Sequence, residues 1–396
     1  MTLSWHLLKK YETAKGIAWR VQYRSPDGKN RTKQGFKTKT EALKWAEVNA
    51  ASIHTQDWID PNAGKTTVET VGKEWLAMQT HLKISTYTLT KSTFDTHIQP
   101  HWGDVSIASI KPSQVQKWIS TMDKGPSTAR RVAACLRQIL DHAVKDGLIK
   151  ANPANGMKLP RKEKPRHVFL TLQDLLFLAS FAPKKFQSII LLLGTSGLRW
   201  GEMAALRPMD LDPLRNRINI TRNIVYVAGE WHLGTPKTHE SRTVAVADFV
   251  IKELLESAKS RKSAELIWQR PDGRPLHPPH NRTWFKIALR DAQAARLKDI
   301  ELAKKDLSKA PKPMPTVTAH DLRHVAAGLL VESGANVKAV QRQLGHASAT
   351  MTLDTYAELF DDGLDSIAAK LDEGFENISD VVDVEWRRHH EGRLAK

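Results

Sequence analysis

One of the 5 tyrosines in this chain of 396 residues lies where its hydroxyl could take part in a reaction. Tyr356 ends the segment Met-Thr-Leu-Asp-Thr-Tyr, ten positions after His346 in Leu-Gly-His. A phenol can attack phosphorus if cations stabilise the phosphate and another group takes up the phenol's proton. A single tyrosine is more often a core aromatic, so other residues must decide between the two interpretations.

Two arginines suit the oxygens of a phosphate. Arg199 follows a glycine turn in Thr-Ser-Gly-Leu-Arg-Trp-Gly-Glu and is expected to start a helix, with Glu202 three residues on. Arg323 lies three residues after His320 in His-Asp-Leu-Arg, a spacing that predicts one shared helix face. A guanidinium stays protonated and donates to phosphate through two N–H groups. Each motif is weak by itself, because such pairs are common at helix starts without any function.

Further polar residues fit the same reaction. Lys237 is expected in the turn of a hairpin, Leu233–Val244, from which it could give a proton to a departing 5′-oxygen. His320 suits the acceptance or shuttling of a proton, and His346 suits donation to the phosphate. Glu202 is expected to orient the arginines and histidines. A lysine in a turn is usually only solvated, so this assignment depends on the others.

The composition points to a polyanionic partner. The chain has 60 Lys and Arg against 43 Asp and Glu, a formal net charge of +17, and a pI near 9.8. Such a charge favours nucleic acid as the partner, although it carries no sequence information. We expect no cofactor and no metal, because the sequence has no phosphate-binding glycine loop, no His-Glu-x-x-His motif and no carboxylate cluster for two metals.

The sequence also predicts a compartment. Cys135 is the single cysteine, which excludes an intrachain disulfide and fits a reducing environment. The longest apolar run, 189–193, is far too short to cross a bilayer, and the N-terminus lacks the apolar segment of a signal peptide. We therefore expect a cytoplasmic, nucleoid-associated protein without membrane contact.

Changes of pattern predict a multidomain α+β protein. In residues 1–60, alternating strands at 17–24 and 30–36 predict a hairpin, and Thr38 with Glu41 predicts the start of a helix. Residues 64–158 show apolar spacing of three and four in four segments and predict a four-helix domain. A proline-bounded, charged connector follows at 157–166.

The rest of the chain predicts a larger, mainly α domain with a small antiparallel sheet at 166–375 and a tail at 376–396. Basic residues of the first two parts could bind DNA, although exposed basic residues often serve solubility only. These DNA-binding candidates are Arg20, Arg24, Lys29, Arg31, Lys33, Lys91, Arg130 and Arg131.

Taken together, the motifs resemble the tyrosine recombinase (phage-type integrase) family. The resemblance covers roughly the second half of the chain and rests on GLRWGE, GTPKTHESR, HDLR, LGH and MTLDTY, which occur in the family's order. The helical domain resembles the family's core-binding domain, and residues 1–60 resemble the arm-binding domain of integrases. In this resemblance the catalytic residues are Arg199, Lys237, His320, Arg323, His346 and Tyr356, with Glu202 in support.

The resemblance implies a site-specific recombinase that joins DNA to Tyr356 as a 3′-phosphotyrosine and integrates or excises a mobile element. It further implies a homo-tetramer on two duplexes, a Holliday junction, and help from a DNA-bending host factor and a directionality factor. By the resemblance the tail at 376–396 would pack onto a neighbouring subunit, with packing on its own domain or disorder as the alternatives. The threonine-rich segment before Tyr356 is expected to be a flexible connection that lets the nucleophile reach the DNA or withdraw.

Two other functions remain open at this point. A type IB topoisomerase shares the chemistry but would relax DNA as a monomer, and the N-terminal module argues against it. A catalytically silent DNA-binding regulator would not need all six catalytic residues.

Overall fold

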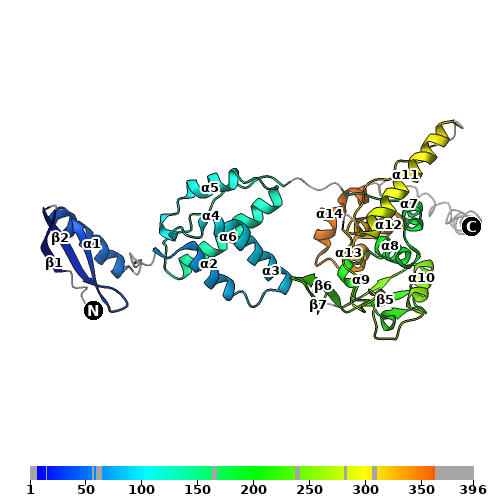
Figure 1. Ribbon diagram of the computed structural model, residues 1–396, viewed down its shortest axis with the longest axis horizontal. Coiled ribbons are helices and arrows are strands. Elements are labelled where there is room, and N and C mark those ends of the chain that lie inside the picture. Colours follow the sequence, from blue (N-terminus) through cyan, green and yellow to red (C-terminus); the bar gives the residue numbers. More distant parts are fainter. Residues whose placement is uncertain are drawn as a thin grey trace, which may run out of the picture. The chain divides into compact units, whose positions relative to one another are not determined.

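The computed structural model describes residues 7–14, 16–55, 58, 65–162, 167–236, 241–280, 283–305 and 310–361. The chain divides into two compact units, 1–164 and 165–396, which are drawn in Figure 1. The expected tail at 376–396 lies outside the described residues. The multidomain α+β class that the sequence predicted is confirmed.

The first unit begins with an antiparallel sheet covered by one helix (Figure 1). The strands are β1 (Leu7–Thr13), β2 (Gly16–Arg24) and β3 (Asn30–Phe36), and the helix is α1 (Lys39–His54). The expected hairpin is β2 and β3, whereas β1 was missed because its sequence, LLKKYET, does not alternate. Thr38 caps α1 as predicted, since its side chain accepts a hydrogen bond from the Glu41 amide at 3.2 Å.

A helical bundle follows the sheet. Its helices are α2 (Val68–Ala77), α3 (Ile84–Thr93), α4 (Gln99–Trp102), α5 (Pro112–Ser120) and α6 (Pro126–Lys145). Between α3 and α4 the chain forms a π-helical turn, Phe94–Ile98, just before Pro100. Proline has no N–H to donate and its ring crowds the carbonyl four residues back, which accounts for the irregular turn there. Phe94 and Ile98 nevertheless point into the core of the bundle.

The first half of the expected connector is bound to this bundle. The Lys158 amide donates to Gln116 Oε1 at 2.8 Å, and Gln116 Nε2 donates back to the Lys158 carbonyl at 3.1 Å. Arg130 Nε donates to the Pro160 carbonyl at 2.8 Å. Residues 157–162 therefore do not form a free linker, and residues 163–166 lie outside the described part of the chain.

The second unit is built around one buried helix. Helix α8 (Lys184–Ser196) contains the apolar run 189–193 and contacts α7 (Leu172–Ser180), α10 (Asp248–Ala258) and α12 (Leu322–Glu332). The remaining helices are α9 (Trp200–Met203), α11 (Trp284–Lys305), α13 (Val337–Leu344) and α14 (Ala349–Asp361). All five side chains of the run are buried, so α8 is the centre of the core.

Strands of the second unit pair differently from the sequence prediction. Strand β8 (Arg242–Ala245) pairs with β5 (Arg217–Ile220), which also pairs with β4 (Leu211–Asp212). Strand β7 (Glu230–Gly234) pairs with β6 (Asn223–Val227). The predicted hairpin at Leu233–Val244 is therefore wrong for the described residues, because its two strands have different partners.

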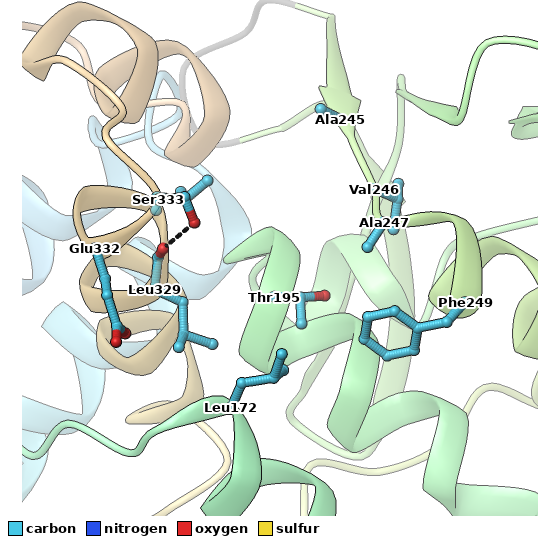
Figure 2. Close-up of a pocket in the computed structure, with 10 residues that line it drawn as sticks. Leu172, Thr195, Ala245, Val246, Ala247, Phe249, Leu329, Glu332 and Ser333 are labelled. Carbon is cyan, nitrogen blue, oxygen red and sulfur yellow. Dashed lines mark hydrogen bonds between the residues drawn. The ribbon is translucent and has the colours of Figure 1, made fainter. Parts of the chain in front are cut away.

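A pocket of about 500 Å³ lies where the ends of α7, α8, β8, α10 and α12 meet (Figure 2). Leu172, Phe249 and Leu329 line it, and Glu332 is the only charged residue among the described residues of its wall. Such a lining suits apolar groups and not a phosphate.

Candidate active site

A glycine turn places the first arginine. Helix α8 ends at Gly197, whose φ of 70° lies in the left-handed region. A Cβ at this position would lie 2.3 Å from Leu344 Cδ2, so no larger residue fits without movement. Two residues later Arg199 begins α9, as the sequence predicted, and its amide donates to Glu202 Oε2 at 2.9 Å.

Glu202 is the buried anion of the site. Its side chain is 0% exposed and accepts hydrogen bonds from two arginines, Arg199 Nη1 at 3.0 Å and Arg242 Nη1 and Nη2 at 2.9 and 2.8 Å. Burial alone would raise the pKa of this carboxyl, but the bonds and charges of Arg242 and Arg199 outweigh it and the pKa is lowered. Glu202 is therefore ionised and fixes both guanidinium groups.

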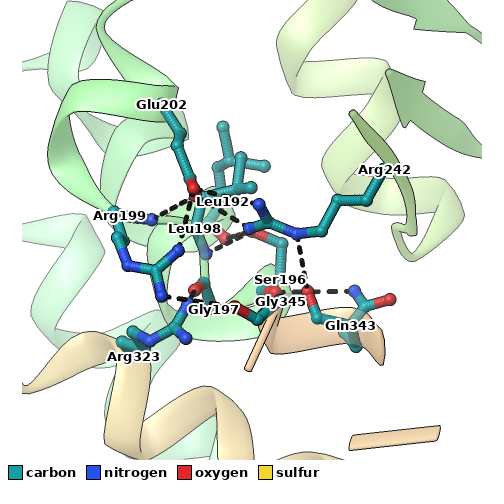
Figure 3. A network of polar contacts seen from close by, with 10 residues as sticks. All are labelled: Leu192, Ser196, Gly197, Leu198, Arg199, Glu202, Arg242, Arg323, Gln343 and Gly345. Atoms are coloured by element: carbon teal, nitrogen blue, oxygen red, sulfur yellow. Dashed lines mark hydrogen bonds and ion pairs between the residues drawn. The ribbon is translucent and has the colours of Figure 1, made fainter. Parts of the chain in front are cut away.

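A chain of contacts runs from Glu202 to the segment that carries His346 (Figure 3). Arg199 Nη2 donates to the Gly345 carbonyl at 3.3 Å. The Gln343 side chain donates to the Ala245 carbonyl at 2.6 Å and accepts from its amide at 2.9 Å, which ties α13 to β8. These bonds connect residues that are about a hundred positions or more apart in the sequence.

Arg323 is the second predicted arginine and is almost fully buried, with 5% of its surface exposed. It lies in the first turn of α12, and its Nη1 donates to the Gly197 carbonyl at 2.5 Å. Its Nη2 has no hydrogen-bond partner among the described residues. Burial, together with the charge of Arg199, lowers the pKa of Arg323 to about 9. A buried cation with an N–H group that lacks a partner among the described residues can bind an anion.

Tyr356 lies at a kink in α14. Its φ of −131° and ψ of 18° are not helical, and only 2% of the residue is exposed. Its hydroxyl is 2.8 Å from His324 Nδ1. Burial raises the pKa of Tyr356 to about 12, against a smaller lowering by Arg323. The hydroxyl is therefore protonated at neutral pH.

His346 packs beside the tyrosine. The two rings are nearly parallel, with centroids 6.2 Å apart and an angle of 7° between the planes. His346 Nδ1 is 2.9 Å from the hydroxyl of Thr352, which is buried on α14. Burial and the nearby arginines lower the pKa of His346 to about 4, so the ring is neutral at neutral pH.

The threonine-rich segment is not the flexible connection that the sequence suggested. It forms the first turns of α14, and Thr352 within it is 0% exposed. The non-helical residue within α14 is Tyr356 itself. Any movement of the nucleophile would therefore start from this kink or from the loop before Ala349.

The predicted site residue His320 lies at the edge of this cluster, against His324. His320 lies in the turn before α12 and not on the helix, although its carbonyl accepts the Arg323 amide at 3.1 Å. The His320 ring is exposed and lies 5.8 Å from the His324 ring, between centroids. Lys237 lies outside the described residues, so its position relative to the cluster is still a prediction.

Sequence reasoning gave no role to three residues that the structure places in the cluster. Arg242 belongs to the quoted motif GTPKTHESR, and His324 directly follows Arg323. His167 comes directly after the connector, and its ring centroid is 4.1 Å from that of His324. The adjacency of His324 to Arg323 was the one signal in the sequence that could have identified it.

The N-terminal DNA-binding candidates lie in different surroundings. Around the β2–β3 turn, Arg24 Nε donates to the Gly28 carbonyl, Arg31 donates to Ser25 and Asp27, and Lys29 lies 3.8 Å from Asp27. These three side chains thus contact the turn itself. Arg20 points from the middle strand, where it lies over the Tyr11 ring, and Lys33 is exposed on β3.

The DNA-binding candidates of the helical bundle also have different surroundings from one another. Lys91 of α3 pairs with Asp95 of the following π-helical turn at 2.5 Å. Arg130 holds the connector at Pro160. Arg131 is exposed on α6.

Neither a metal site nor a membrane span was found in the described part of the chain. There, no group of three or more His, Cys, Asp or Glu is arranged to hold a metal ion. None of the described helices combines the length and the apolarity that crossing a membrane requires.

Two family models match the chain. The phage integrase family matches residues 169–362, and the phage integrase central domain matches residues 68–159. Among curated proteins, the integrase of Mycobacterium phage D29 is 25% identical over 339 residues, which are 81% of this chain and 84% of that protein.

Solved structures share the fold. The Tn1549 transposon integrase in complex with transposon right end DNA has a TM-score of 0.60 at 23% identity, over 78% of this chain and 99% of that chain. A lambda integrase tetramer bound to a Holliday junction has a TM-score of 0.53 at 18% identity, over 86% and 96% of the two chains.

Proposed function

This chain belongs to the phage integrase family of tyrosine recombinases and is a site-specific DNA recombinase; from this premise we propose how its residues cleave and rejoin DNA. The observation that carries the proposal is the buried guanidinium of Arg323, whose Nη2 has no hydrogen-bond partner among the described residues and whose charge interacts with Arg199 and Tyr356. Arg199, Arg242 and Arg323 bring three positive charges, and Glu202 balances one of them. A phosphate would complete the site.

The proposed reaction is an in-line exchange at one phosphorus. Tyr356 Oη attacks the phosphorus and forms a new P–O bond while the bond from phosphorus to the 5′-oxygen breaks. Arg199 and Arg323 bind the non-bridging oxygens, whose charge grows in the transition state. Lys237 gives a proton to the 5′-oxygen, and His320 takes the proton of Tyr356. His346 donates a hydrogen bond to the phosphate.

The product would be a 3′-phosphotyrosine and a free 5′-hydroxyl. One P–O bond replaces another, so the link keeps the energy of the phosphodiester, and a 5′-hydroxyl from a second strand can reverse the step. This exchange needs no nucleotide cofactor and no metal.

The three domains would have different roles in binding and cleaving the DNA. We propose residues 1–60 as an arm-type DNA-binding domain, 64–158 as a core-binding domain and 166–375 as the catalytic domain. Relatives of this fold include an integrase bound to transposon end DNA and a tetramer bound to a Holliday junction. By analogy this chain would act as a homo-tetramer on attachment sites of a mobile element, with a DNA-bending host factor and a directionality factor as further partners.

A nicked substrate tests the proposed nucleophile. The duplex would carry the junction sequence of the element that encodes the chain, with a nick that lets the short 5′-hydroxyl fragment diffuse away. Wild type should accumulate a covalent adduct at the 3′ side, and Tyr356→Phe should form none. An adduct that persists in Tyr356→Phe, or no adduct on any junction sequence, would contradict the proposal.

A sulfur-substituted substrate tests Lys237. If Lys237 is the acid, Lys237→Ala should cleave the normal substrate slowly and a 5′-bridging phosphorothiolate at nearly the wild-type rate, because a thiolate leaves without a proton. Equal defects on both substrates would exclude this role.

A further inference from the structure

We propose that His324 is a positioning residue for the nucleophile: its Nδ1 accepts the hydrogen bond of the Tyr356 hydroxyl and fixes the direction of its oxygen lone pairs. This inference rests on the proposed role of Tyr356. It adds a residue that neither the motif positions nor the charge of the site requires.

The contact is direct and enclosed. His324 Nδ1 and Tyr356 Oη are 2.8 Å apart, which is a normal length for such a bond. The two ring centroids are 5.6 Å apart with an edge-to-face angle of 61°. His167 closes the other side, with centroids 4.1 Å from His324 and 5.8 Å from Tyr356. Both partners of the bond are therefore held by packing.

The position of His324 also fits the kink. It lies on α12 directly after Arg323, whose amide and side chain are fixed by His320 and Gly197. Tyr356 leaves the helical conformation at the residue that makes this bond. The bond to His324 on α12 thus holds Tyr356 at the point where the helical backbone of α14 is interrupted.

The protonation state of the His324 ring supports its role as a hydrogen-bond acceptor. Burial and the neighbouring His167 and His320 lower the pKa of His324 to about 4, while Asp321 acts weakly against them. The ring is thus neutral at neutral pH, and with its proton on Nε2 it offers the Nδ1 lone pair. Because this nitrogen is a weak base, we assign His324 the orientation of the hydroxyl and not the final uptake of its proton. During the attack the proton of Tyr356 would leave along this bond to Nδ1 while the proton on Nε2 passes on to His320, whose ring centroid lies 5.8 Å from that of His324.

The geometry predicts which side chains in place of His324 will keep the hydrogen bond to Tyr356. An asparagine places its amide near the position of Nδ1, whereas a glutamine places its amide near Nε2. His324→Asn should keep the hydrogen bond, and His324→Gln, although closer in size, should lose it. His324→Ala removes both the bond and the packing.

The experiment measures single-turnover adduct formation at saturating enzyme on the nicked junction duplex. His324→Ala and His324→Gln should cleave about 10- to 100-fold more slowly than wild type, since a small misplacement of a reacting group has effects of this size. His324→Asn should recover most of the rate. DNA affinity and the thermal midpoint of His324→Asn and His324→Gln should be alike, so that stability does not explain their difference. His280→Asn, an exposed histidine of the same unit, is the control.

The phosphorothiolate substrate separates the two sides of the reaction. His324→Ala should stay slow on it, because the defect lies with the nucleophile and not with the leaving group. Rescue by sulfur, equal rates for the Asn and Gln variants, or a wild-type rate for His324→Ala would each overturn the inference. None of these outcomes contradicts the proposed role of Tyr356. Absence of an adduct in wild type would contradict that role.

Discussion

At the residue scale, Glu202 determines whether three arginines can lie together. Its two oxygens accept side-chain bonds from Arg199 and Arg242, while Arg323 is placed by a backbone carbonyl. The carboxylate does not bind Arg323, whose Nη2 has no partner in the part of the chain that the structure describes. This division explains how the site can hold its arginines firmly and still offer a donor to DNA.

We expect Glu202→Gln to destabilise the second unit by about 2 to 4 kcal/mol, because the two guanidinium groups lose a buried counter-charge. Differential scanning calorimetry would report the shift of this unit's transition. Glu256→Gln is the control, since Glu256 and its partner Lys259 are 70% and 75% exposed, and such a pair contributes little. An equal, small shift in both variants would contradict the role of Glu202.

The two half-buried histidines of the site predict a loss of stability in mild acid. The pKa values of His324 and His346 are lowered from 6.5 to about 4, so between these pH values the unfolded chain binds protons that the folded chain does not. Stability should be full above pH 6.5 and fall as the pH drops towards 4. Glu202 adds a similar loss only below its ordinary value of 4.5.

Thermal midpoints measured from pH 7 to pH 5 test this linkage. The midpoint of the second unit should fall over this range, and His346→Asn should make the fall shallower because one of the two groups is gone. A slope that does not change in this variant would show that His346 is not the group responsible.

At the element scale, the turn between α8 and α9 joins the two arginine positions. Gly197 ends α8, its carbonyl accepts Arg323 Nη1, and Arg199 follows it by two residues. Gly334, after α12, has a similar φ of 84°, but a Cβ added there would meet no atom of the described residues within 4 Å. Substitutions at Gly334 and Gly197 therefore separate the cost of backbone strain from the cost of steric crowding.

Gly334→Ala should cost about 1 kcal/mol, the usual effect of a side chain at positive φ. Gly197→Ala should cost clearly more, because its Cβ meets Leu344, and it should also slow cleavage by displacing the Arg323 contact. Denaturant unfolding and adduct formation would measure the two effects. Equal losses in the free energy of unfolding for both variants would mean that the turn at Gly197 shifts and avoids the contact with Leu344.

How far the sequence could predict these elements depended on the distance between contacting residues. The glycine turn, the start of α9 and the cap at Thr38 follow from residues within four positions of one another, and all three were predicted. The pairing of β8 with β5 and the Arg242–Glu202 ion pair join residues from elements that are not neighbours in the chain, the ion pair across 40 positions, and no local pattern encodes them. His324 was overlooked for the same reason, because its partner is 32 positions away.

At the scale of the whole molecule, the net charge of +17 does not say which basic residues meet DNA. The N-terminal sheet offers a comparison, because its register places basic side chains on both faces. Lys33 pairs with Val21, which is 0% exposed and packs in the core with Ala42 of α1. Arg20 pairs with Lys9 and Gln34 and so points to the face opposite to that of Val21 and α1.

If the face opposite to α1 enters a groove, Arg20→Gln should weaken binding to the element's own arm DNA by about 1 to 3 kcal/mol, and Lys33→Gln should weaken it much less. Both changes remove one charge, so both should reduce the affinity for random duplex to a similar, salt-dependent extent. Fluorescence anisotropy on specific and random duplexes at several salt concentrations would measure this. A larger effect of Lys33→Gln on the specific duplex would place the DNA on the helix side of the sheet, where Arg31 lies over the Trp58 ring. The two variants lose the same charge but lie on opposite faces of the sheet. Only direct contact of one face with the DNA therefore predicts that their affinities for the specific duplex differ while their affinities for random duplex stay alike.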